Sequence, residues 1–317
     1  PDQRHLATST GSACVACHMP SQVYMGVDAR RDHSMRIPRP DVSLSTGSPN
    51  ACTQCHEDRT DSWAYEALQQ WGVSTDFQEL SLVKARFAAD RGDVRSLPTL
   101  ESVVTDDERS PLMRASLIEQ LGNLGSRQLP SLTAMLLRAD APELRASAVR
   151  ATRSMPPAQR YLMLRPFISD PVLTIRMEVA QVLAGVPASE LRPQDIDDLK
   201  PLFEEYLAVQ ANHLDMPSVH MQLASFWLDR GDSEQALSAL EEAVYLNPQL
   251  EPAVVNLVDL LRRTGKDVEA SALLETSLVL LPDSGNLWFS QGLHLIRLGD
   301  TESGLESLRR AAALEQE

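Results

Sequence analysis

Two copies of one short pattern, Cys-x-x-Cys-His, hold the residues best suited to chemistry: Cys14, Cys17 and His18, and then Cys52, Cys55 and His56. The two copies together use all four cysteines of the chain. The pattern is the attachment signature of c-type haem, because two thiols at this spacing bond to the vinyl-derived carbons of the porphyrin and the adjacent histidine reaches the iron as an axial ligand. The sequence therefore predicts two haem c groups, one on each pair of cysteines.

Two other chemistries use the same residue types. Paired Cys-x-x-Cys units also fit a four-cysteine zinc site, although zinc does not need the histidine that follows each pair, and the segment between the pairs is long for a compact zinc ribbon. A disulfide within each pair is typical of redox-active enzymes, but no thioredoxin-like strand pattern accompanies either pair. The histidine after each pair favours haem over both alternatives.

A haem iron with one histidine ligand needs a sixth ligand or keeps an open site. The side chains near the motifs that could supply it are His5, His33, Met19, Met25 and Met35. His33 is favoured because it lies in the segment RRDHSMRIPRPD, where X-Pro pairs stiffen the chain; the alternative is a solvated loop. His5 is a second candidate, unless the N-terminus is frayed. Arginines of the same segment suit the carboxylates of haem propionates, and the candidates are Arg31, Arg36 and Arg39.

Composition divides the chain into a loop-rich start and a long helical remainder. Residues 1–60 are rich in Pro, Gly, Ser and Thr and lack helical periodicity, so a cofactor is expected to organise them. From residue 61 the pattern becomes helical, and Trp63, Ala67, Leu68 and Trp71 fall on one helix face. Aromatic residues make up only 5% of the chain, which also favours helical packing over β-sandwiches. We expect a mostly α protein with a dihaem segment over residues 1–78.

Two kinds of helical repeat follow this segment. Arg114, Arg145 and Arg176 recur at equal intervals within similar units, which indicates HEAT-like helix pairs over residues 79–194. A longer period then relates Gly231, Gly265 and Gly299, and its length is that of a tetratricopeptide repeat. Three such repeats are predicted over residues 217–317, with a linking helix over residues 195–216. Gly304 and Ser277 depart from the usual alanine.

The run CVACHMP…YMGVDARRDHSMRIPRPD…GSPNACTQCH resembles the haem-binding core of bacterial multihaem cytochromes that carry tetratricopeptide repeats. It also resembles the closing haem pair of pentahaem nitrite reductases, although their lysine-bearing catalytic motif is absent from this sequence. The resemblance covers about residues 5–63. It implies bis-histidine iron, with His18 and His56 as proximal ligands and His33 and His5 as distal ligands, and it leaves open which distal histidine serves which haem. It also implies further haem domains upstream.

The expected function is one-electron transfer with low reduction potentials, because bis-histidine iron excludes substrate and lacks the methionine that raises the potential. Two alternatives remain: an enzyme that reduces a small substrate at a five-coordinate iron, and a scaffold with structural haems. The helical repeats are expected to dock a redox partner protein, such as another multihaem cytochrome, or to assemble a complex or oligomer. We therefore expect an electron-transfer protein rather than an enzyme.

The net charge and the expected cofactor limit which partners and which cellular compartment are expected for the chain. A net charge of −15 argues against nucleic acid as a partner, and residues 79–317 carry −12 of it, which suits a basic redox partner or simply solubility. No run of 18 apolar residues is present, so no membrane span is expected. The chain begins with Pro1 and reads as a processed or truncated product. Haem c attachment implies export to the bacterial periplasm or the cell surface.

Overall fold

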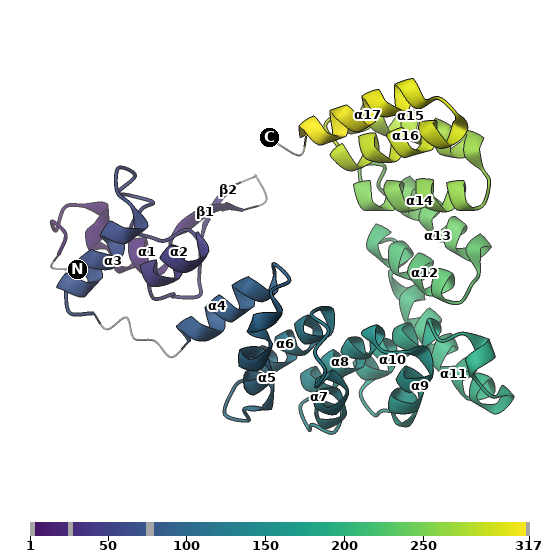
Figure 1. Cartoon of the computed structure of the whole chain (residues 1–317), viewed down its shortest axis with the longest axis horizontal. Coiled ribbons are helices and arrows are strands. Elements are labelled where there is room, and N and C mark those ends of the chain that lie inside the picture. The colour runs from purple at the N-terminus through teal and green to yellow at the C-terminus, as the bar shows by residue number, and fades with distance from the viewer. Residues whose placement is uncertain (1–3, 25–27, 74–78, 315–317) are drawn as a thin grey trace. The chain divides into compact units, whose positions relative to one another are not determined.

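The computed structural model describes residues 4–24, 28–73 and 79–314. Within these residues the regular structure consists of 17 α-helices, short 3₁₀ turns and one two-stranded antiparallel sheet (Figure 1). The expected mostly α fold, with a solenoid of helical repeats, is confirmed. Contacts divide the chain into two compact units, residues 1–132 and 133–317. The boundaries expected from composition, after residues 78, 194 and 216, stay predictions.

The first unit begins with short elements that alternate with loops. These elements are α1 (Cys14–His18), β1 (Ser21–Tyr24), β2 (Asp28–Arg31), α2 (Pro40–Thr46) and α3 (Asp61–Gln70). Strands β1 and β2 pair in register from Ser21 opposite Arg31 to Tyr24 opposite Asp28, and all their side chains are exposed. Helix α3 begins where the Thr60 hydroxyl accepts a hydrogen bond from the Trp63 backbone N–H at 3.2 Å. This cap fixes the start of the amphipathic helix that the tryptophan spacing predicts.

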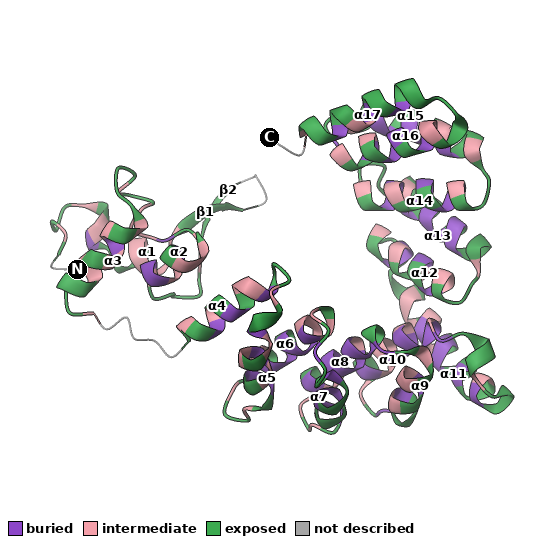
Figure 2. Cartoon of the chain, viewed as in Figure 1, coloured by how far each residue is buried: buried purple, intermediate pink, exposed green. Residues whose placement is uncertain are grey.

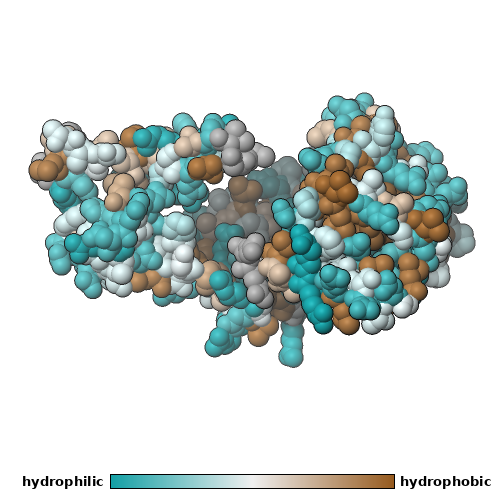
Figure 3. Space-filling model, turned by 90° about the horizontal axis from the view of Figure 1, so that it is seen from above, coloured by the Kyte–Doolittle hydropathy of each residue, from teal (hydrophilic) through white to brown (hydrophobic). Residues whose placement is uncertain are grey.

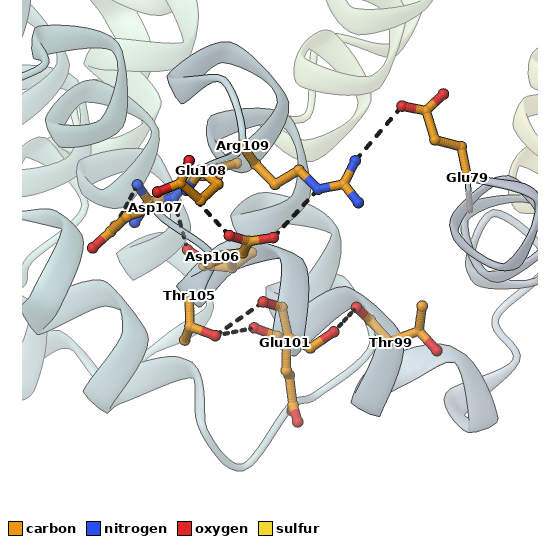
Figure 4. A network of polar contacts seen from close by, with 11 residues as sticks. Glu79, Thr99, Glu101, Thr105, Asp106, Asp107, Glu108 and Arg109 are labelled. Carbon is orange, nitrogen blue, oxygen red and sulfur yellow. Dashed lines mark hydrogen bonds and ion pairs between the residues drawn. The ribbon is translucent and has the colours of Figure 1, made fainter. Parts of the chain in front are cut away.

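The rest of the first unit is built from longer helices, α4 (Leu80–Ala89), α5 (Leu97–Thr105), α6 (Pro111–Asn123) and the start of α7 (Leu129–Leu136). A polar network holds the loop between α5 and α6 (Figure 4). Arg109 donates from Nε to a carboxylate oxygen of Asp106 at 3.3 Å, and its Nη1 lies 3.6 Å from a carboxylate oxygen of Glu79. The loop is thereby tied to the residue that precedes α4.

Helices of the HEAT-like kind continue in the second unit as α8 (Pro142–Ala151), α9 (Pro157–Leu164), α10 (Leu173–Ala184) and α11 (Pro193–Gln210). The arginine that recurs at equal intervals fastens the turn before its own helix. Arg145 Nη1 donates to the Ala139 carbonyl at 2.9 Å, and Arg176 Nη1 donates to the Asp170 carbonyl at 2.7 Å. Arg114 Nε donates to the Val104 carbonyl at 2.9 Å. The period therefore marks a repeated way of closing a helix–helix turn.

Three antiparallel helix pairs complete the chain, as the tetratricopeptide period predicts (Figure 1). They are α12 (Pro217–Asp229) with α13 (Ser233–Leu246), α14 (Glu251–Arg263) with α15 (Asp267–Leu280), and α16 (Gly285–Leu298) with α17 (Thr301–Leu314). The turn of each pair contains a glycine with positive φ, at 78° for Gly231, 78° for Gly265 and 95° for Gly299. Only glycine adopts this backbone without steric cost, which explains its recurrence.

The glycine that departs from the usual alanine has a packing reason. A Cβ atom on Gly304 of α17 would lie 2.6 Å from Cγ1 of Ile296 and 2.9 Å from the carbonyl oxygen of Gly292, both on α16. The last helix pair therefore approaches more closely than an alanine allows. Ser277, the other departure, is buried on α15 with 3% of its surface exposed.

Burial differs between the two ends of the chain (Figure 2). The solenoid helices bury apolar side chains throughout, and Leu183, Val258 and Leu287 are fully covered. In residues 4–24 and 28–63, by contrast, no aliphatic or aromatic side chain other than Pro40 is buried. The start of the chain therefore lacks the hydrophobic core that the repeats possess.

Candidate cofactor site

One cleft in the first unit brings both cysteine motifs together. Its lining includes motif residues Ala16, Cys17, His18, Cys52, Cys55 and His56. One wall comes from α3, whose lining residues are Trp63, Ala64, Ala67, Leu68 and, just after the helix, Trp71. The helix face that the sequence predicts to be apolar thus faces the motifs, and Trp71 on that face is 39% exposed. Cys14 is exposed and is not part of the lining.

The first motif forms α1, a single helical turn. Because residues three apart share a helix face, Cys14 and Cys17 project from the same side. Arg31, at the end of β2, donates from Nη1 to the carbonyl of Val15 at 3.2 Å and to that of Met19 at 3.1 Å. These bonds satisfy carbonyls at the end of the short helix, so Arg31 holds the motif in its helical form.

His18 is oriented by the backbone. Its Nδ1 lies 2.8 Å from the carbonyl oxygen of Arg36, which can only accept a hydrogen bond, so Nδ1 carries the proton. Nε2 is then left with its lone pair, and a metal-binding histidine is commonly fixed in this way. Helix α1 and the Arg36 carbonyl together fix the orientation of the His18 ring, and ligation of iron by His18 stays a prediction.

The second motif forms a turn that Asn50 caps. The side-chain oxygen of Asn50 accepts from the backbone N–H of Cys52 at 3.0 Å and from that of Thr53 at 3.2 Å. Its amide nitrogen donates to the Asp61 carboxylate at 2.6 Å. Asp61 is the first residue of α3. Asn50 therefore connects the second motif to the helix that forms the apolar wall.

His56 packs between two rings within this cleft. Its ring centre lies 4.8 Å from that of Trp63 and 6.3 Å from that of His5. His5 rests on Gly11, where an added Cβ would lie 2.5 Å from His5 Cδ2. The N-terminal histidine is thus held against the second motif, and Gly11 provides the space for it.

The thiols of the two motifs influence one another. Burial raises the pKa of the Cys52 thiol, and the neighbouring thiols of Cys17 and Cys55 raise it further. Nowhere in residues 4–24, 28–73 and 79–314 do three His, Cys, Asp or Glu side chains gather in a way that could hold a metal ion.

His33 and the three candidate arginines are not part of the cleft lining. His33 occupies an exposed turn after β2. Arg36 pairs with Asp32, with Nε and a carboxylate oxygen 2.9 Å apart, while its own side chain is 73% exposed. Arg39 donates to Asp41 at 2.6 Å, and both side chains are largely buried. Contacts of Arg31, Arg36 and Arg39 with haem propionates stay a prediction, and so does ligation by His33.

The Arg39–Asp41 pair is an electrostatic anchor at the start of α2. Burial by itself would raise the pKa of the Asp41 carboxyl, but the hydrogen bonds and charge of Arg39 hold that pKa below its usual value. Asp41 is therefore ionised at neutral pH, and the pair fixes the end of the segment that carries His33.

The methionine candidates and the missed residues complete the comparison with the sequence. Met35 is 58% exposed, and Met25 lies outside the described residues. Arg4 and Ile37 line the cleft, although no sequence pattern singled them out. The Arg36 carbonyl was also missed, because a backbone acceptor has no signature in residue type. The spacing of Trp63 and Trp71 was the one sequence signal that an apolar helix face lines this cleft.

The donor set and walls suit haem c. Two cysteine pairs, each followed by a histidine, face an apolar helix surface, and apolar linings with a few polar groups are typical of cofactor pockets. His18 and His56 would hold iron, while Trp63, Leu68 and Trp71 would contact the porphyrin.

In the described part of the chain, no helix has both the length and the apolar character that a bilayer crossing requires.

Comparisons with known proteins give only distant structural similarity. No protein-family model matches the chain, and no protein of curated function matches its sequence. Among solved structures, a tetratricopeptide repeat protein from Parabacteroides merdae is 14% identical, covering 74% of this chain and 92% of its own, with a TM-score of 0.43. YrrB, described as a TPR protein with an unusual peptide-binding site, is 14% identical over 69% of this chain and 93% of its own, with a TM-score of 0.35. MamA from MSR-1 is 18% identical over 54% of this chain and 92% of its own, with a TM-score of 0.37. At TM-scores this low, no conclusion about this chain rests on them.

Proposed function

We propose that this chain is an exported electron-transfer protein, a c-type cytochrome that carries two haems and docks its redox partner through helical repeats. Haem c, when bound, supplies an iron that takes up and releases one electron. The residues of the chain attach the group through Cys14, Cys17, Cys52 and Cys55, orient His18 and His56 toward the iron, and exclude water with the face of α3.

The observation that carries this proposal is the convergence of both motifs on one cleft. The motifs are far apart in the sequence, yet Cys17 and His18 line the same space as Cys52, Cys55 and His56. A pair of unrelated redox disulfides would not require an apolar wall beside them, whereas a porphyrin does. Two groups attached here would be close neighbours, which is what rapid transfer of an electron between them requires.

The repeats support the docking part of the proposal. Residues 133–314 expose apolar side chains at several helices, among them Tyr245 at 78%, Val268 at 81% and Val279 at 80%. The space-filling view shows apolar patches set among hydrophilic residues (Figure 3). Surfaces of this mixed kind are typical of protein interfaces, and the acidic repeats favour a basic partner, such as another multihaem cytochrome.

A second candidate is a scaffold in which the haems are chiefly structural. It is favoured by the absence of buried aliphatic or aromatic side chains, Pro40 aside, in residues 4–24 and 28–63. A segment of this size without a core needs covalent or cofactor staples. Both candidates require haem attachment and differ in whether electrons are exchanged with a partner at a useful rate.

Visible absorption of the full chain, matured in a host that attaches haem c, tests the proposal. We expect sharp low-spin α and β bands after reduction, two haems per chain in a pyridine haemochrome assay, and rapid reoxidation by a basic cytochrome. Low-spin haems that exchange electrons with no partner would favour the scaffold. A high-spin band with fast CO binding in the unmodified chain would favour an enzyme with an open iron.

A further inference from the structure

The rings of His5 and His56 lie in one cleft at a distance that leaves room for one metal ion between them. Their centres are 6.3 Å apart, and the rings are inclined by 36°. An imidazole–metal bond is about 2 Å long, and the ring centre lies roughly 1 Å behind the bonding nitrogen, so two imidazoles on opposite sides of one ion have centres about 6 Å apart.

We propose that His5 and His56 are the two axial ligands of one iron, that of the haem attached to Cys52 and Cys55. This assignment rests on the proposed function and deepens it, because residue types alone leave the partner of each distal histidine open. It makes the N-terminal segment a structural part of the second haem site, although it precedes the first motif in the chain.

Contacts on both sides of His5 hold it in this place. Gly11 leaves no room for a Cβ under the ring, since that atom would be 2.5 Å from His5 Cδ2. The intervening loop is closed by the Ser9 backbone N–H, which donates to the Leu6 carbonyl at 2.8 Å, and by the Ser12 hydroxyl, which donates to the Ser9 carbonyl at 2.8 Å. The loop is therefore a fixed support for the ring.

A neighbouring contact ties the same segment to the cleft wall. The guanidinium carbon of Arg4 lies 4.9 Å from the centre of the Trp71 ring, within the range of a cation–π interaction. Trp71 follows α3, and Trp63 near the start of that helix packs on His56. The helix thus contacts His56 through Trp63, and Trp71 after it contacts Arg4, the residue before His5.

His33 is the competing sixth ligand for this iron, and His18 is the competing partner for His5. His33 is exposed and does not line the cleft. The ring beside His5 is that of His56, whereas the Arg36 carbonyl lies 2.8 Å from Nδ1 of His18 and leaves Nε2 of that ring open. The observed geometry therefore favours the pairing of His5 with His56 over either alternative.

The test uses full chains that each retain one haem. C14S/C17S keeps the haem at the second motif, and C52S/C55S keeps the haem at the first. Adding His5→Ala is expected to convert the C14S/C17S protein from low-spin to high-spin iron, with CO uptake rising from none to one per chain. The same change in C52S/C55S should leave the spectrum unchanged. The opposite pattern would show that His5 serves the first haem and would overturn the assignment.

Two further variants guard against a folding defect. In the chain that keeps all four cysteines, His5→Ala should open one of two haems, and added imidazole should restore the low-spin bands. Gly11→Ala should also produce high-spin iron, because the new Cβ displaces His5. Gly185→Ala serves as the control for a glycine substitution, because a Cβ there would meet only the ends of the Arg160 and Asp229 side chains, in the second unit. If both haems stay low-spin in His5→Ala, the assignment fails while the cytochrome function stands; if no haem attaches to the unmodified chain, the function itself fails.

Discussion

The helical repeats and the motif-bearing segment before them reach a folded state by different routes. The repeats bury aliphatic side chains in successive clusters, such as Leu240 with Leu257 and Val258 with Leu274. Residues 4–24 and 28–63 bury Pro40 and four polar side chains, Ser12, Asp41, Ser43 and Asn50, and their order comes from capping bonds and ion pairs. The difference shows that the repeats have a hydrophobic core of their own, whereas the segment is ordered by polar contacts, and we propose that haem attached to its cysteines stabilises it.

Loss of haem attachment is expected to have the largest effect, and to affect the motif-bearing segment rather than the repeats. With all four cysteines changed to serine, we expect the segment up to residue 73 to lose its order, because backbone bonds alone do not offset its conformational entropy. The repeats should keep their helix content and their thermal transition. Amide hydrogen exchange, read by region, measures both effects in one experiment. Equal protection of the segment with and without haem would contradict the account.

A core substitution in the repeats should instead destabilise the repeats and leave the motif-bearing segment unchanged. Leu183 is fully buried on α10, and Leu183→Ala is expected to lower the free energy of unfolding of the repeats by about 2–5 kcal/mol. Leu162→Ala on α9 is the control, since that side chain is 71% exposed and its loss should cost less than about 0.5 kcal/mol. Urea unfolding followed by circular dichroism measures the difference. Neither variant should alter the haem spectrum, and a spectral change would show that the regions are coupled.

The recurrent arginine offers a finer test within the repeats. Arg176 donates to the Asp170 carbonyl at 2.7 Å and pairs with Glu205, with Nε and a carboxylate oxygen also 2.7 Å apart. Arg176→Met keeps the aliphatic bulk but leaves the carbonyl unpaired, so we expect a loss of about 1–3 kcal/mol. Arg95→Met should change stability little, because that side chain is 89% exposed and pairs only with its neighbour Asp93. A loss no larger than that of the control would show that the period has no structural role.

The smallest expected effect concerns pH and the Arg39–Asp41 pair. The pKa of Asp41 in the folded chain lies below its usual value, so its contribution to stability is present above the ordinary carboxyl pKa and is lost as the pH falls below about 4, toward the lower folded-state pKa. Proteolysis of the segment should therefore accelerate in that acidic range. Asp41→Asn should reduce this acceleration, and an unchanged pH profile in the variant would exclude the pair as its cause.

The periods of the sequence predicted the repeats well because repeats rely on local rules. The turn glycines at positions 231, 265 and 299 have the positive φ that their regular spacing suggests. Two of the aligned arginines, Arg145 and Arg176, donate from Nη1 to equivalent carbonyls of the preceding turn. The Trp63 and Trp71 pattern predicted a helix face but not what that face covers. A long-range arrangement decides that, and residue spacing does not encode it.

The histidines show the same limit at the candidate site. The Cys-x-x-Cys-His spacing predicts which residues would attach the proposed haems, since those residues are close together in the chain. The place of His5 against His56, and the role of the Arg36 carbonyl toward His18, depend on how distant loops fold back. Residue type alone does not show which of the two histidines, His5 or His33, lies against His56.

The mass of the intact matured chain, with and without each cysteine pair, tests the central claim most directly. We predict that the full chain gains the mass of two haem groups, that C14S/C17S and C52S/C55S each gain one, and that the chain without all four cysteines gains none. A full chain that leaves a competent host with its four thiols unmodified would contradict the account.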